Sequence, residues 1–143
     1  MIEQINNYIE SLLNSTPEKP LWNVEIIKGN KKTSWNYIDG CMLSSLMQLY
    51  KNTKNEKYFN FVKNYVDYFI LEDGTIKTYE IEKFELDSIC ESRILFDLFE
   101  LTKDEKYKKL FNAFLPIISE NILKQRLVHF LLSKLILQKS ELS

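Results

Sequence analysis

Leu49-Tyr50-Lys51-Asn52-Thr53-Lys54-Asn55-Glu56-Lys57-Tyr58 recurs 49 residues later as Leu98-Phe99-Glu100-Leu101-Thr102-Lys103-Asp104-Glu105-Lys106-Tyr107. Each copy ends an apolar helical pattern and then carries Thr-x-x-Glu, the capping box that satisfies free amides at a helix start, with Asn55 or Asp104 as a competing cap. The repeating unit is therefore predicted to be a helical hairpin. Because such units bury their apolar faces against one another, the repeat predicts an all-α stack of hairpins.

The composition favours a single helical domain. The chain has 143 residues, 45% of them hydrophobic, with only 3 Gly and 3 Pro, which disfavours disorder and all-β folds. Its 19 Lys and Arg nearly balance 20 Asp and Glu, so no net electrostatic field attracts nucleic acid or an anionic membrane.

No segment is apolar enough to span a membrane and no secretion signal is recognisable, so we expect a cytoplasmic protein. Cys41 and Cys90 lie in apolar helical patterns and are expected to be buried, reduced thiols that bind no metal.

Apolar spacing places helices on both sides of each repeat copy. They are predicted over residues 2–13, from about 35 to 50, from about 56 to 70, from about 88, and over 105–118. Thr33 or Ser34 is expected to cap the second helix, whose apolar surface is broad enough for an inner helix. Residues 75–84 are typical of a loop or small hairpin. Long loops of this kind are where a pocket would be built.

Two places carry residues that can do chemistry. Asp87 stands just ahead of the fourth predicted helix, where its carboxylate can cap the helix, or can hydrogen-bond a sugar and move a proton at a pocket mouth. The two roles are compatible. Trp35, Asn36 and Tyr37 stand at the start of an inner helix, where aromatic rings can stack on sugars and an amide can bind hydroxyls. Packing is the alternative role for these aromatic residues.

These sites occur in an order that resembles glycoside hydrolase family 105, the unsaturated rhamnogalacturonyl hydrolases, and the related family 88 of unsaturated glucuronyl hydrolases. The resemblance covers about residues 20–120. The motifs that carry it are Trp35-Asn36-Tyr37-x-x-Gly40, Leu49-Tyr50-x-x-Thr53-x-x-Glu56-Lys57-Tyr58, Asp73-Gly74-x-Ile76, Glu85-Leu86-Asp87-Ser88-Ile89 and Leu98-Phe99-x-x-Thr102-Lys103-Asp104-Glu105-Lys106-Tyr107.

The resemblance implies an (α/α)6 toroid and an unusual hydrolysis. In the family, an acid protonates the C4=C5 double bond of a 4,5-unsaturated uronic acid left by a pectin lyase. Water adds at C5, and the hemiketal opens to release the neighbouring sugar without a metal or other cofactor. By this resemblance Asp87 is a catalytic aspartate that contacts the unsaturated sugar, Tyr37 binds substrate, and Trp35 and Asn36 form the adjoining wall of the substrate-binding pocket.

The resemblance ends near residue 120. Family members continue with Phe-Trp-His and then Trp-Leu-Asp-Gly, whose aspartate is the principal acid/base, and neither motif occurs in this chain. The chain therefore divides into residues 1–120, about half of an (α/α)6 toroid, and a divergent apolar helical tail, residues 121–143. His129 lies in the apolar pattern of this tail and is expected to be a core or surface residue rather than a catalytic one.

Half a ring would leave the inner helices partly uncovered. We therefore expect a truncated chain that is weakly active or inactive alone, with exposed inner helices through which a homo-oligomer could form. The alternative function is a helical-repeat module that binds a protein partner without catalysis.

Overall fold

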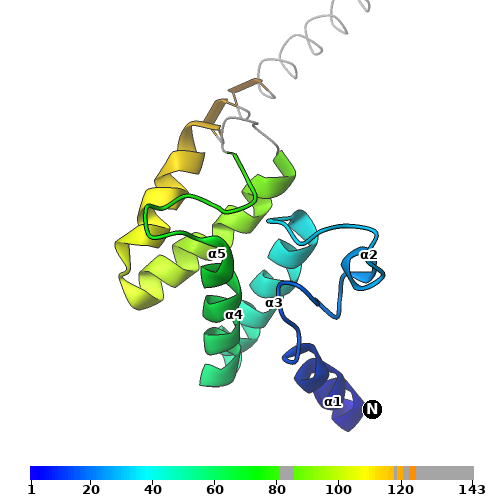
Figure 1. The fold of residues 1–143 in the computed structure, drawn as a ribbon. Coiled ribbons are helices and arrows are strands. Elements are labelled where there is room, and N and C mark those ends of the chain that lie inside the picture. Colours follow the sequence, from blue (N-terminus) through cyan, green and yellow to red (C-terminus); the bar gives the residue numbers. More distant parts are fainter. Residues whose placement is uncertain (81–85, 118, 121–122, 125–143) are drawn as a thin grey trace, which may run out of the picture.

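The computed structural model describes residues 1–80, 86–117, 119–120 and 123–124, and of residues 86–92 it describes only the helix that they form. Figure 1 shows an array of helices: α1 (Ile2–Leu12), α2 (Val24–Ile27), α3 (Tyr37–Thr53), α4 (Glu56–Phe69), α5 (Leu86–Thr102) and a further helix over 105–117. Within these ranges β-structure is limited to isolated bridges. The all-α prediction is confirmed. The predicted tail, 121–143, lies outside the described residues apart from 123–124.

The 49-residue repeat is reproduced at the level of single hydrogen bonds. Helices α3 and α5 are each 17 residues long. Each is followed by a lysine in the left-handed region, Lys54 with φ 56° and Lys103 with φ 58°. The amide of each lysine donates a 2.7 Å hydrogen bond to a carbonyl four residues earlier, on Tyr50 or Phe99. The link between the two helices of a hairpin is therefore built identically in both copies.

The caps at these links differ from the predicted capping box. Asn55 is the N-cap of α4, and its Oδ1 accepts a 3.2 Å hydrogen bond from the amide of Lys57. Asp104 repeats this contact at 3.1 Å with the amide of Lys106. Thr53 is instead the last residue of α3, and its hydroxyl donates back to the carbonyl of Leu49. Asn55 and Asp104, the competing caps, therefore cap the second helix of each hairpin. Thr53 and Thr102 lie at the end of the preceding helix, too far from the amides of the next one.

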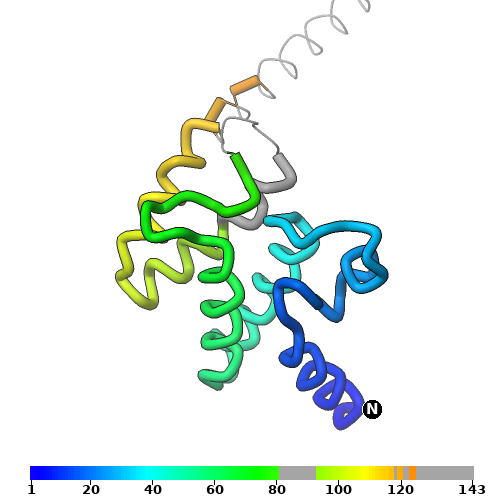
Figure 2. The backbone as a smooth tube through the Cα atoms, viewed as in Figure 1, coloured from blue at the N-terminus to red at the C-terminus, as the bar shows by residue number. Residues whose placement is uncertain are grey.

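The hairpins form an inner and an outer layer. In Figure 2, α3 and α5 run in one direction, whereas α4 and helix 105–117 run back beside them. Helix α3 packs against both α4 and α5, as predicted for an inner helix. Near the end of α3, Lys51 forms a 2.6 Å ion pair with Asp97 in α5. The core between the layers includes Leu43, Met47, Val62, Val66, Leu95, Leu98, Leu110 and Phe114.

Polar contacts also link each outer helix to an earlier helix of the chain. The buried Tyr107 donates a 2.5 Å hydrogen bond through its hydroxyl to Oδ1 of Asp67 in α4. Lys106 and Lys63 pair with the same carboxylate at 3.0 and 2.6 Å. In the first hairpin Lys57 pairs with Glu10 of α1. We call the contact of Lys106 and Tyr107 with Asp67 the outer clasp.

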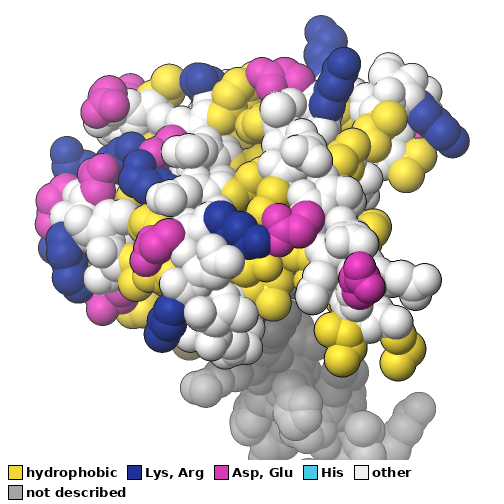
Figure 3. Space-filling model, turned by 90° about the horizontal axis from the view of Figure 1, so that it is seen from below, with side chains coloured by type: hydrophobic (Ala, Val, Ile, Leu, Met, Phe, Trp, Pro, Cys, Tyr) yellow, Lys and Arg dark blue, Asp and Glu magenta, His cyan; other side chains and the backbone are white. Residues whose placement is uncertain are grey.

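The surface carries both signs of charge. Figure 3 shows Lys and Arg side chains interspersed with Asp and Glu over the face seen from below, with hydrophobic side chains between them. This mixture agrees with the near balance of charge in the sequence. No helix within the described ranges is both long and apolar enough to cross a membrane.

Candidate functional site

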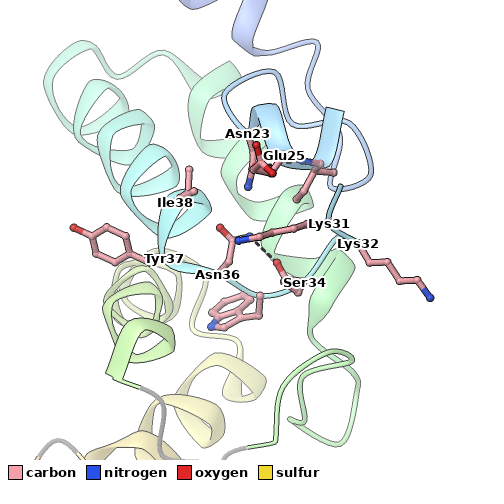
Figure 4. A pocket seen from close by; sticks show the side chains of 10 residues that line it. Asn23, Glu25, Lys31, Lys32, Ser34, Asn36, Tyr37 and Ile38 are labelled. Atoms are coloured by element: carbon pink, nitrogen blue, oxygen red, sulfur yellow. Dashed lines mark hydrogen bonds between the residues drawn. The ribbon is translucent and has the colours of Figure 1, made fainter. Parts of the chain in front are cut away.

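An open hollow of about 420 Å³ lies where the chain enters α3. It is lined by Asn23, Glu25, Ile26, Lys31, Lys32, Ser34, Trp35, Asn36, Tyr37 and Ile38 (Figure 4). These residues come from α2 and its N-cap, from the segment that follows α2, and from the start of α3. The hollow therefore collects all three predicted substrate-binding residues.

Asn36 fixes the entry into α3. It is the N-cap, in place of the predicted Thr33 or Ser34, and its Oδ1 accepts a 3.0 Å hydrogen bond from the amide of Asp39. Its Nδ2 donates a 2.7 Å hydrogen bond to the carbonyl of Ser34. The side chain is thus held rigidly at the rim, while each of its two polar atoms keeps further hydrogen-bonding capacity.

The two aromatic residues beside Asn36 have different environments. Tyr37, the first residue of α3, is half exposed, and Figure 4 shows its ring pointing away from Asn23 and Glu25. Trp35 is buried and packs edge-on against Phe69, with 5.8 Å between ring centroids. Tyr37, 48% exposed, can therefore contact a ligand over a much larger area than Trp35, which is only 5% exposed.

A hydrogen bond ties this entry to the loop before α5. The amide of Trp35 donates to Oγ1 of Thr78 at 2.8 Å. Thr78 belongs to the segment predicted as a loop or small hairpin, which the structure describes as a turn with bridges between Ile70, Ile76 and Tyr79. The chain segments that precede the two inner helices therefore meet at one end of the array.

Asp87 lies in α5, which begins at Leu86 rather than near Ser88. It is therefore in the first turn of the helix instead of ahead of it. Its side chain lies outside the described residues, so the role of this carboxylate stays a prediction.

A second carboxylate, Asp39, is buried beneath the start of α3. Its Oδ1 accepts a 2.9 Å hydrogen bond from Nε1 of Trp22, and its Oδ2 accepts a 2.8 Å hydrogen bond from the hydroxyl of Tyr65. Burial raises the pKa of Asp39 above its ordinary value, although the hydrogen bonds from Trp22, Tyr65 and Asn36 oppose the shift. Since Asp39 does not line the hollow, it supports the site from below.

The charged residues of the hollow were not predicted. Lys31 and Lys32 follow the Gly29-Asn30 turn, and Glu25 accepts a 3.2 Å hydrogen bond from Nδ2 of Asn30. The signal that could have found them is a pair of lysines just before a helix start, where cations can bind an acidic ligand together with the helix amides.

Cys41 does not line the hollow. Cys41 is a free thiol on the exposed side of α3, so the prediction that it is buried is wrong; the helix turns this position away from α4 and α5. The side chain of Cys90 lies outside the described residues. Among the side chains that the structure describes, no three His, Cys, Asp or Glu form a group that could hold a metal ion.

Together these features define an all-α protein of stacked hairpins with an open hollow at the start of an inner helix. Residues 6–130 match the family model of Glycosyl Hydrolase Family 88, and the chain belongs to this family. A solved structure of a glycoside hydrolase from family 105 of C. acetobutylicum ATCC 824 is 35% identical, with a TM-score of 0.58. The match covers 66% of this chain but only 27% of the length of the family 105 hydrolase.

These matches confirm the resemblance to families 105 and 88. The fold matches part of an α/α toroid glycosidase, as the resemblance implied.

Proposed function

We propose that this chain supplies part of the substrate site of a glycoside hydrolase that acts on 4,5-unsaturated uronic acid oligosaccharides. The reaction is hydration of the double bond: C4 receives a proton, C5 receives the hydroxyl of water, and the resulting hemiketal opens to release the neighbouring sugar. Membership of family 88 and the likeness to a family 105 hydrolase support this choice.

One observation carries the proposal. The hydrogen bond from the amide of Trp35 to Thr78 joins the start of α3 to the segment that leads toward Asp87. Asn36 and Tyr37, at this start, line the hollow. A sugar in the hollow could therefore meet residues from both inner-helix starts. Sites of this kind combine an apolar wall with a few polar groups that set the orientation.

Each residue has a distinct role in this proposal. Tyr37 and Asn36 hydrogen-bond sugar hydroxyls, and Trp35 forms part of the apolar wall. Lys31 pairs with the carboxylate of the uronic acid, because a lysine ammonium is a compact cation with three donors. Asp87 assists proton delivery to C4. Since the Trp-Leu-Asp-Gly motif is not in this sequence, we expect little turnover from these 143 residues alone.

Binding and turnover are tested separately. The chain is titrated with an unsaturated rhamnogalacturonan disaccharide, binding is followed by ligand-observed NMR, and turnover by the ultraviolet absorbance of the conjugated double bond. We expect weak binding. Tyr37→Ala and Lys31→Ala should each lower the affinity about tenfold, which corresponds to a loss of about 1.4 kcal/mol of binding free energy. Any turnover should fall in Asp87→Asn.

The control is Glu3→Gln, which removes an exposed acid in α1, far along the chain from the hollow. It should bind the disaccharide like the unchanged chain. A folded chain that does not bind the disaccharide, or whose binding is insensitive to Tyr37→Ala and Lys31→Ala, would contradict the proposed site.

The noncatalytic alternative is also favoured by one observation, the exposure of apolar side chains on the inner helices, including Ile38 and Phe96. A helical-repeat module would bind its partner through such a surface. The predicted homo-oligomer would use the same residues. The cytoplasmic location stays a prediction.

A further inference from the structure

The second hairpin exposes apolar residues at positions where the first hairpin buries them. With the 49-residue offset, Met47 in α3 corresponds to Phe96 in α5, and Val66 in α4 corresponds to Leu115 in helix 105–117. Met47 and Val66 are 1% and 0% exposed, whereas Phe96 and Leu115 are 50% and 43% exposed. The same positions therefore have opposite environments in the two copies.

The first hairpin buries these positions because the second hairpin packs against it. Met47 and Val66 belong to one core cluster with Leu95 and Leu110 of the second hairpin. No corresponding layer covers Phe96 and Leu115 within the described ranges. Apolar residues retained at docking positions indicate that another apolar segment packs there.

A third position completes this surface. Val62 is fully buried in the first hairpin, and its counterpart Phe111 is only partly buried. The rings of Phe111 and Phe96 lie 5.7 Å apart, beside a hollow of about 170 Å³. The hollow is lined by Phe96, Phe99, Lys108, Phe111 and Asn112. We call Phe96, Phe111 and Leu115 the open face.

The polar contacts of the first hairpin are not repeated at the open face. Asp67, which receives the outer clasp, corresponds to Pro116, and its partner Lys63 corresponds to Asn112. Lys51, which pairs with Asp97, corresponds to the acidic Glu100. A further hairpin with its own Lys-Tyr pair would therefore find no carboxylate at the position of Asp67. The open face therefore suits an apolar segment better than a further hairpin of the same kind.

We propose that residues 125–143 of this chain pack on the open face. Between residues 127 and 137 this segment has one charged residue, Lys134, and its apolar residues are Leu127, Val128, Phe130, Leu131, Leu132, Leu135, Ile136 and Leu137. Seven residues, 118–124, join the segment to helix 105–117, and 119–120 and 123–124 among them are helical. Because the segment belongs to the same chain, its local concentration at the open face exceeds that of a second copy in dilute solution.

Protease sensitivity tests the packing. In the full chain, trypsin should cut slowly after Arg126 and Lys134 if the open face holds the segment. Phe96→Asp and Leu115→Asp should each accelerate cleavage about tenfold, because an ionised side chain at the contact weakens packing and opens the segment. Leu131→Asp, in the segment itself, should have the same effect. Circular dichroism verifies that the helices of each variant stay folded.

Leu101→Asp is the matched control. Leu101 is 44% exposed and Leu115 is 43% exposed, so the two leucines are matched in exposure. The repeat counterpart of Leu101 is Asn52, an exposed polar residue, so Leu101 lies outside the docking surface. This variant should leave the cleavage rate unchanged. Rapid cleavage of the unchanged chain, or equal acceleration by Leu101→Asp, would overturn the proposal.

Cross-linking separates this packing from a contact between two copies. Leu115→Cys and Leu131→Cys are combined in a Cys41→Ser, Cys90→Ser background and treated with a short dithiol-reactive cross-linker. An intramolecular product at all protein concentrations supports the proposal. A covalent dimer that grows with protein concentration would show that a second copy covers the open face, and the absence of either product would show that the segment does not reach it.

Discussion

The hydroxyl of Tyr65 donates a 2.8 Å hydrogen bond to Oδ2 of Asp39, so α4 holds the first turn of α3 through a buried polar contact. Trp22 bonds the other carboxylate oxygen from the segment before α2. Three parts of the chain therefore meet at one side chain directly beneath the candidate site. The position of Asn36 and Tyr37 depends on this contact.

Asp39→Ala should lower the free energy of unfolding by about 2–4 kcal/mol, because it removes the acceptor of a buried tyrosine hydroxyl and of a partly buried indole N–H. Asp39→Asn should cost less, since its carbonyl can still accept from Trp22 and its amide can donate to the hydroxyl of Tyr65. Urea denaturation at neutral pH measures both. Equal losses in the two variants would contradict a role for the hydrogen bonds.

Asp39 should also make stability depend on pH. Burial raises its pKa above the ordinary value of 3.8, so the folded state holds the proton to a higher pH than the unfolded state. Its contribution is fully present below pH 3.8 and is lost as pH rises through the folded-state pKa. Subtracting the stability curve of Asp39→Asn from that of the unchanged chain should reveal this fall; a difference that rises with pH would show the opposite shift.

Asp67 should have the opposite pH dependence. Burial would raise its pKa, but hydrogen bonds from Lys63, Tyr107 and Lys106 outweigh burial and hold it below 3.8. Its contribution is therefore present above pH 3.8 and is lost as pH falls through the folded-state pKa. At neutral pH, Asp67→Asn should cost about 1.5–3 kcal/mol, the range for hydrogen bonds to a charged group.

A double-mutant cycle between Asp67→Asn and Tyr107→Phe should show coupling of about 1 kcal/mol at neutral pH that declines in acid. Tyr8→Phe removes an exposed tyrosine hydroxyl from α1 and should change stability by less than about 0.5 kcal/mol. If the effects of Asp67→Asn and Tyr107→Phe on stability are purely additive, the outer clasp is contradicted.

Lys54→Gly and Lys103→Gly should each stabilise the chain by about 0.5–1 kcal/mol. Both lysines adopt the left-handed conformation that glycine accepts without steric cost at the end of a helix. The matched control is Lys108→Gly, inside helix 105–117, which should cost about 1 kcal/mol. Thermal unfolding of the three variants measures the contrast; destabilisation by all three would mean that the lysine side chains outweigh the backbone effect.

The fold could be read from the sequence because its signals are local. The repeat around Thr53 and Thr102 predicted the hairpins, and apolar spacing predicted which helices lie inside. The errors are also local: Asn36 rather than Thr33 or Ser34 caps α3, because several polar residues near a helix start compete for the same amides.

The candidate site was less predictable because its contacts join distant segments. Tyr37 and Asn36 could be selected from residue type and place, but the burial of Asp39 depends on Trp22 and Tyr65, which lie 17 and 26 residues away. The hollow with Lys31 likewise forms only once α2 folds against the entry to α3. A single sequence contains no direct signal for such contacts.

The identical links after α3 and α5 have a geometric consequence. Lys54 and Lys103 differ by only 2° in φ, and their amides make hydrogen bonds of the same length, although the surfaces beside them differ. The bend within each hairpin is therefore set by about ten residues of chain and does not depend on what packs against it. A change in what packs on one face of a hairpin would therefore leave the turn inside that hairpin unchanged.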